Sequence, residues 1–369
     1  PEGLSLAVLL IALLESLGVT LEFQRSEAAI EFDSAYQGAL EAGLDDEQFL
    51  AGYGRDRLEA AIAAFEAVFE ASERFGKRYD VQRDHFYLGL LLEIGGRDRD
   101  RALAEYGRAI ELEPNFARAH LRRANLFLLL GDLDSALADY DRTIAIEPDW
   151  RPARYDRGLA RRRAGDPKGA IEDFDSALGK GRFEAKVHAM RGLAWADAGD
   201  PAAALADYGR ALAIDPDDVE TLANRGNLLR ELGETEKALA DYDRAIDLSP
   251  DSAAFRANRA AVRADAHDLA GALADVDRAL ALQPDHPDAL DTRGTIRLEQ
   301  GDPSSALADF EAAALLAPDR WLVQAHVGQA RVTLGDQPGA VQAFRAALDR
   351  CRDPAWRPRL EETIRQLGG

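Results

Sequence analysis

Residues 117–150 read ARAHLRRANLFLLLGDLDSALADYDRTIAIEPDW, and this 34-residue stretch is the unit from which most of the chain is built. A fixed period of this length predicts a stack of supersecondary units, because one unit cannot bury its apolar face alone. Two series of residues follow the period, with one gap in the prolines where Arg182 stands: Pro114, Pro148, Pro216, Pro250, Pro284 and Pro318, and Ala102, Ala136, Ala170, Ala204, Ala238, Ala272, Ala306 and Ala340.

Each unit contains two helical segments joined by a short turn. The turn reads Gly-Asp in most units, as in Gly131-Asp132. Glycine supplies the left-handed residue that ends the first helix, and aspartate caps the second. The proline near the end of the unit stops the second helix. The sequence therefore predicts antiparallel helix pairs.

The spacing of the recurring residues resembles the tetratricopeptide repeat, whose signature is W-x2-L-G-x2-Y, then A-x3-F, then P, over 34 residues. The match recurs eight times from about residue 82. The resemblance implies an all-α fold, a right-handed α-solenoid of antiparallel helix pairs. In residues 219–252 the matching positions are Leu222, Arg225, Gly226, Leu229, Ala238, Tyr242, Ala245 and Pro250.

We expect three regions along the chain. Residues 1–81 are predicted to hold N-terminal helices with a divergent helix pair, residues 82–354 the array of repeats, and residues 355–369 a C-terminal capping helix that covers the last open face. The repeat at residues 151–184 lacks the proline, so a local bend or looser packing is expected there.

Residues 4–14 read LSLAVLLIALL and are almost wholly apolar. The run is too short to span a bilayer, and no basic residue precedes it as in a signal peptide. We expect a buried helix that covers the end of the stack, with a remnant anchor or a self-association surface as the alternatives. The candidates for self-association are Leu6, Leu9, Leu10, Leu13 and Leu14.

The charge and the cysteine content exclude some classes of function. The net charge is −21, from 66 acidic and 45 basic residues, and this balance repels phosphate backbones. We expect no nucleic acid partner and no integral membrane span. The single cysteine, Cys351, rules out an internal disulfide framework and leaves the compartment open.

No constellation of an enzyme is present in the sequence. It lacks a glycine-rich phosphate loop, a nucleophile elbow and paired histidines at metal spacing. We expect no catalytic residues, no metal and no cofactor. The acids in triplets such as Asp139-Tyr140-Asp141 and Asp241-Tyr242-Asp243 are interpreted as solvated helix surface.

The resemblance implies that binding residues lie on the concave face, which the first helices of the repeats line. The candidates at those positions are Arg118, Arg122, Asn125, Tyr155, Arg162, Arg163, Lys186, Asn224, Asn227 and Asn258. The arginines favour an acidic segment or a carboxylate. Alternatively, they pair with aspartates of neighbouring repeats and bind nothing.

Later repeats place a more acidic set at the same positions of the concave face, and the carboxylate clamp that holds chaperone C-termini in this family is incomplete. Asp288 and Thr292 stand where the clamp needs lysine or arginine, which disfavours a chaperone tail as ligand. The set at these positions is Arg230, Asp265, Asp288, Asp291, Thr292, Glu299, His326 and Gln329.

The sequence therefore favours a non-enzymatic scaffold that binds a protein or peptide segment in the concave groove. The alternative is a structural subunit that associates end to end into a homo-oligomer or polymer through its apolar N-terminal helix. A third possibility is the regulatory part of a longer polypeptide.

Overall fold

The computed structural model describes residues 82–96, 98–179 and 183–368, with Glu59, Ile62, Ala63 and Glu66 before them. Within these residues every regular element is a helix, as predicted, and no helix is both long and apolar enough to cross a membrane. Residues 4–14, the five leucines proposed for self-association and almost all of the divergent helix pair lie outside the described residues.

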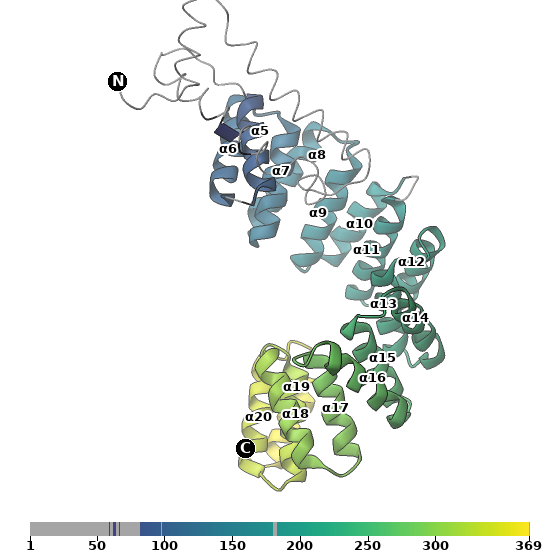
Figure 1. Ribbon diagram of the computed structural model, residues 1–369. Helices are drawn as coiled ribbons and strands as arrows, with labels where there is room; N and C mark the ends of the chain where they lie inside the picture. The colour runs from purple at the N-terminus through teal and green to yellow at the C-terminus, as the bar shows by residue number, and fades with distance from the viewer. Residues whose placement is uncertain are drawn as a thin grey trace, which may run out of the picture. The chain divides into compact units, whose positions relative to one another are not determined.

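The chain divides into two compact units, residues 1–178 and 179–369. The division falls in the repeat that lacks the proline. From residue 82 on, the described part of the first unit holds three helix pairs (Figure 1): α5 (Gln82–Ile94) with α6 (Arg99–Leu112), α7 (Ala117–Leu130) with α8 (Leu133–Ile146), and α9 (Arg151–Arg163) with α10 (Pro167–Ala177).

Residues 183–368 of the second unit form five helix pairs and one further helix (Figure 1). The pairs are α11 (Phe183–Asp197) with α12 (Pro201–Ile214), α13 (Val219–Glu231) with α14 (Thr235–Leu248), α15 (Ala253–Asp265) with α16 (Leu269–Leu282), α17 (Pro287–Glu299) with α18 (Pro303–Leu316), and α19 (Trp321–Thr333) with α20 (Gln337–Arg350); α21 (Arg357–Gln366) follows. We call the first helix of each pair the A helix and the second the B helix.

The turns within the pairs have the predicted geometry. Gly131 ends α7 with φ 85°, in the left-handed region, and Asp132 accepts a hydrogen bond from the backbone N–H of Ser135. Both groups satisfy helix-end atoms that would otherwise lack partners. The Gly-Asp pair therefore sets the chain reversal.

Glycine at the eighth position of a repeat lets the A and B helices touch. A Cβ placed on Gly158 would lie 2.7 Å from the ring of Phe174, closer than carbon atoms can approach. The same ring contact recurs at Gly192 and Gly294. The aromatic side chain on the B helix is thus packed onto bare backbone of the A helix.

The acids that flank these aromatics are not alike, and the interpretation of both as solvated surface is wrong for the first one. The acid before the aromatic is buried and bonded to an arginine 16 residues earlier on the A helix of the same repeat. Five such pairs occur among the described residues, and a sixth, Arg259–Asp275, recurs in the repeat where Val276 replaces the aromatic; the five are Arg123–Asp139, Arg157–Asp173, Arg191–Asp207, Arg225–Asp241 and Arg293–Asp309.

The pairs are bidentate. Arg157 donates from Nε and Nη2 to the two carboxylate oxygens of Asp173, at 2.9 and 2.5 Å. Burial raises the pKa of Asp139, but Arg123 and His120 outweigh this effect and hold the pKa below its ordinary value. The acid after the aromatic is exposed as predicted; Asp141 receives a 2.6 Å bond from Arg157 of the next repeat.

One repeat, residues 253–286, departs from the others at two positions. Val276 stands where neighbouring repeats have an aromatic ring, while Ala260 at the eighth position is shared with Ala124 of residues 117–150. His267 ends the turn after α15 with φ 59°, where the other described turns use glycine. The packing of this repeat therefore lacks the ring found in its neighbours.

The last helix, α21, lies against α20. Leu360 and Ile364 are buried with Phe344 and Ala347, while Glu361 remains exposed on the other side. The exposed side of α21 carries charged residues such as Glu362 and Arg365.

Candidate functional site

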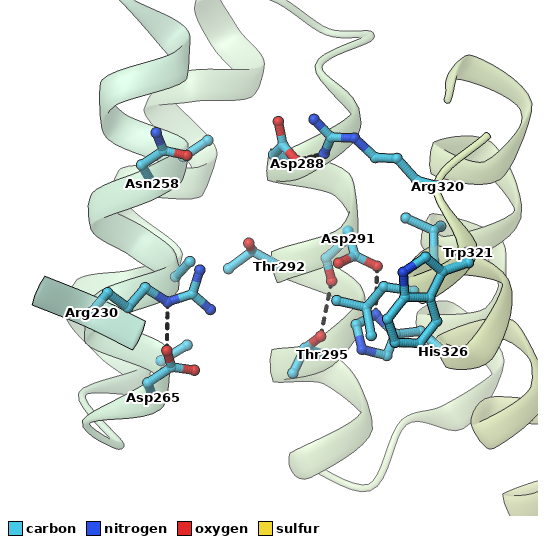
Figure 2. A pocket seen from close by; sticks show the side chains of 15 residues that line it. Arg230, Asn258, Asp265, Asp288, Asp291, Thr292, Thr295, Arg320, Trp321 and His326 are labelled. Atoms are coloured by element: carbon cyan, nitrogen blue, oxygen red, sulfur yellow. Dashed lines mark hydrogen bonds and ion pairs between the residues drawn. The ribbon is translucent and has the colours of Figure 1, made fainter. Parts of the chain in front are cut away.

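A hollow of about 390 Å³ opens on the side of α13, α15, α17 and α19 that faces away from the B helices. Figure 2 shows its labelled side chains converging from successive A helices. The volume lies within the range of roughly 300–1,000 Å³ typical of ligand sites. All lining residues belong to the second unit.

The hollow exists because α15 presents small side chains there. Ala257, Ala261 and Ala264 form its wall on this helix. In the preceding repeat the position of Ala261 is Asn227, whose side-chain oxygen accepts a 2.5 Å hydrogen bond from Tyr242. Since the tyrosine position in this repeat is Val276, neither group fills the space.

Two exposed ion pairs stand at the edges of the hollow. Arg230 on α13 donates from Nε to Asp265 at the end of α15, at 2.5 Å, and Arg320 before α19 pairs with Asp288 on α17. Their side chains are 39% and 55% exposed in the first pair and 52% and 36% in the second. Solvent therefore screens both pairs.

A third acid, Asp291 on α17, lines the hollow beside His326 and Trp321 (Figure 2). It is bonded to Nδ1 of His326 on α19 at 2.8 Å, and its side chain is only 20% exposed. The imidazole of His326 also packs on the Phe310 ring, with the centroids 5.3 Å apart. These contacts fix the position of the carboxylate.

One wall of the hollow is aromatic and apolar. Trp321, Leu322 and Val323 line it from the first turn of α19. The Trp321 ring packs on that of Trp356, with the centroids 5.6 Å apart. An indole held in this way offers a rigid flat surface to a ligand.

Of the ten residues predicted to bind a partner, Asn258 alone lines the hollow. Its side chain also hydrogen-bonds the hydroxyl of Tyr242, whose pKa is raised mainly by burial. Asn224 and Asn227 lie on α13 and Lys186 on α11, in the same unit but outside the lining.

The other six predicted residues lie together on α7 and α9 of the first unit, where they contact neighbouring groups. Arg122 lies 3.5 Å from Glu93, and Arg163 donates to the backbone oxygen of Leu128 at 3.0 Å. Arg118 stacks over the Phe86 ring and Tyr155 against the Phe174 ring. The six are Arg118, Arg122, Asn125, Tyr155, Arg162 and Arg163.

Between these side chains lies Asp156. Burial raises its pKa to about 6, against the opposing effects of a hydrogen bond from Asn125 and the charge of Arg122. Asn125 in turn accepts a 2.6 Å hydrogen bond from Tyr140. The predicted basic patch is thus a connected polar network.

Sequence reasoning placed Arg230, Asp265, Asp288, Asp291, Thr292 and His326 on the concave positions, and all six line the hollow. It missed Arg320, Trp321 and the alanines of α15. The signal that could have located the hollow is the break in the regular series of aromatic residues, at Val276.

Among the residues that the structure describes, no three His, Cys, Asp or Glu side chains are grouped so that they could hold a metal ion. The hollow is instead lined by ion pairs, one amide, two threonines and an aromatic wall. Such a surface suits non-covalent recognition of a polar segment.

Four tetratricopeptide repeat models match the chain, at residues 91–149 and 155–219, 208–240, 226–266 and 259–326. Among curated protein sequences, none matches.

Several solved structures resemble the chain. The APC/C hetero-tetramer Cut9–Hcn1 is 14% identical, with a TM-score of 0.54 over 74% of this chain and 52% of that one. The type IV pilus biogenesis factor PilW is 18% identical, with a TM-score of 0.52 over 56% and 96%. YrrB, a TPR protein with an unusual peptide-binding site, is 26% identical, with a TM-score of 0.42 over 51% and 97%.

The family models cover the described helices from α6 into α19, and the caps, glycines and aromatics of these helices follow the repeat signature. The chain belongs to the tetratricopeptide repeat family, and its paired helices form a protein-interaction scaffold.

Proposed function

We propose that this scaffold is non-enzymatic and binds a segment of a partner protein in the hollow on α13, α15, α17 and α19. The observation that carries the proposal is the hollow itself, with its alanine wall, its amide and its tryptophan. A recess that combines apolar surface with a few fixed polar groups is the usual form of a ligand site.

The polar groups suit an extended segment. The Asn258 amide has both a donor and an acceptor, so it can hydrogen-bond a ligand's peptide group. The threonines on α17 add hydroxyls on the opposite wall. A bound backbone would thus be held between α15 and α17.

The edge ion pairs do not obstruct binding. Arg230–Asp265 and Arg320–Asp288 are exposed, and such pairs contribute about 0–1 kcal/mol each. A ligand can therefore exchange with them at small cost.

The test begins with peptides selected from a random displayed library on the full chain. Ala261→Phe fills the hollow from its α15 wall, and Ala254→Phe adds the same ring to the same helix outside the lining. We expect Ala261→Phe to weaken the selected peptides about tenfold or more and Ala254→Phe to leave their Kd unchanged. Isothermal titration calorimetry gives both values. Equal affinity for the two variants would place the binding elsewhere.

A basic patch that binds an acidic segment stays a separate proposal for Arg118, Arg122, Arg162 and Arg163. The contacts of Arg122 with Glu93 and of Arg163 with the Leu128 carbonyl favour the alternative, in which these arginines pair within the unit. The proposal of an acidic ligand would be wrong if reversing the charges of Arg122 and Arg162 left the affinity for a selected acidic peptide unchanged.

End-to-end association through residues 4–14 also stays a proposal. At the other end, α21 exposes Glu361, Glu362 and Arg365, which disfavours an apolar contact there. A full chain that stays monomeric in concentrated solution, by light scattering with and without residues 1–25, would count against it.

A further inference from the structure

We infer that the hollow selects a partner segment carrying a basic side chain, which Asp291 and Trp321 hold between them. The inference rests on the proposed function, since it names the kind of segment that the hollow takes.

The three carboxylates of the hollow are not equally neutralised. Asp265 is paired with Arg230 and Asp288 with Arg320, so each faces a permanent cation. Asp291 is bonded to the imidazole of His326 and forms no ion pair with an arginine among the described residues. It is thus the acid of the hollow that a basic ligand can reach without displacing an arginine.

Burial strengthens the attraction at this acid. The Asp291 side chain is 20% exposed, against 55% for Asp265. An interaction between charges grows as the surrounding dielectric falls. A basic side chain that reaches Asp291 therefore gains more than one that meets the acid at the edge.

The adjacent aromatic wall suits a cation. Figure 2 shows Trp321 and Asp291 on the same side of the hollow. Ammonium and guanidinium groups are attracted to indole faces within about 6 Å. The structure already holds one such contact nearby, because Arg359 lies 5.0 Å from the centre of the Trp356 ring that packs on Trp321.

The charge of the whole chain acts in the same direction. A net charge of −21 attracts basic segments and repels acidic ones during encounter. The two arginines of the hollow could attract an acid, but each already has a carboxylate partner. A basic ligand needs no such exchange at Asp291.

The experiment uses the peptides selected on the full chain, with acetylated N-termini so that only side chains supply positive charge. In each peptide the basic residue is replaced by glutamine, and both peptides are titrated against the wild type and Asp291→Asn. We expect the replacement to weaken binding to the wild type about tenfold and to Asp291→Asn less than about twofold.

Asp247→Asn is the matched control, because it removes the same charge from the exposed face of α14. It should retain the tenfold difference. If the selected peptides are instead acidic and bind the Arg230→Gln variant more weakly than the wild type, the inference of a basic ligand is wrong. The proposed function would still stand in that case. Peptides insensitive to Ala261→Phe overturn the proposed function itself. Thermal unfolding of each variant verifies that it is folded.

Discussion

Asp156 in the first unit is a carboxyl that the fold prefers to keep protonated. Burial raises its pKa to about 6, from an ordinary value of 3.8, although Asn125 and Arg122 act in the opposite direction. Between these two values the folded protein binds a proton that the unfolded chain releases, so the stability falls as pH rises through this window.

Asp156→Asn should therefore stabilise the protein above pH 6. The expected gain is roughly 1–2 kcal/mol near neutrality, and it should shrink as pH falls from 6 toward 4 and disappear below about 3, where the wild-type carboxyl is neutral in both states. Thermal unfolding across this pH range measures the difference. Asp149→Asn, at an exposed turn, should give a curve parallel to the wild type. A gain for Asp156→Asn that does not vary with pH would contradict the assignment.

The buried acids also show what the sequence concealed. Asp139 and Asp141 are both adjacent to Tyr140, yet the first is buried and the second exposed. Residues two positions apart on a helix are separated by about 200° around its axis, so Asp139 and Asp141 cannot lie on the same face. The sequence does hold the partner, an arginine 16 residues before the buried acid, but the pairing becomes visible only when the A and B helices are packed.

At the scale of the helix, α6 lacks the aspartate that on other B helices forms an ion pair with an arginine of the following repeat. Asp141 and Asp243 contact Arg157 and Arg259 of the following repeat at 2.6 and 2.7 Å. The same position on α6 is Gly107. A Cβ added there would lie 3.6 Å from Nη1 of Arg123, which leaves room for a carboxylate.

Gly107→Asp should therefore complete the bridge between the first two repeats. Gly107→Asn is the matched control, because it has the same shape and a similar helix propensity without the charge. We expect the aspartate variant to be more stable by about 0.5–1 kcal/mol in urea unfolding, with the difference reduced by salt. Equal midpoints at low salt would show that no ion pair forms.

The helices could be predicted far better than the hollow. Turn glycines, capping aspartates and stop prolines mark helix ends through local chemistry, so Gly131 and Asp132 suffice to end α7 and begin α8. The hollow arises from side chains that are missing, at Ala261 and Val276, and from helices that meet only after packing. The residues that recur from repeat to repeat do not indicate where such an empty space lies.

At the scale of the second unit, α21 covers the apolar end of α20. Leu360→Ala should destabilise this end by roughly 2–3 kcal/mol through the lost contacts and the cavity left behind. Because each repeat contacts mainly its neighbours, hydrogen exchange should accelerate in α20 and α21 and stay unchanged in α11 and α13.

Glu361→Ala, on the exposed side of the same helix, is the control and should leave exchange unaltered. Uniform acceleration across residues 183–368 after Leu360→Ala would mean that the unit opens in a single cooperative step.

The arginine–aspartate pairs also have a kinetic consequence. Each joins residues only 16 apart, and the side-chain bridges between A helices, such as Arg230–Asp265, join residues 35 apart. Folding rates fall as the sequence separation of contacts grows, because longer loops must close first. Within residues 82–368 these ion pairs close short loops, so folding of the array can start at any repeat and spread to the next, at a rate set by the repeat and not by the chain length.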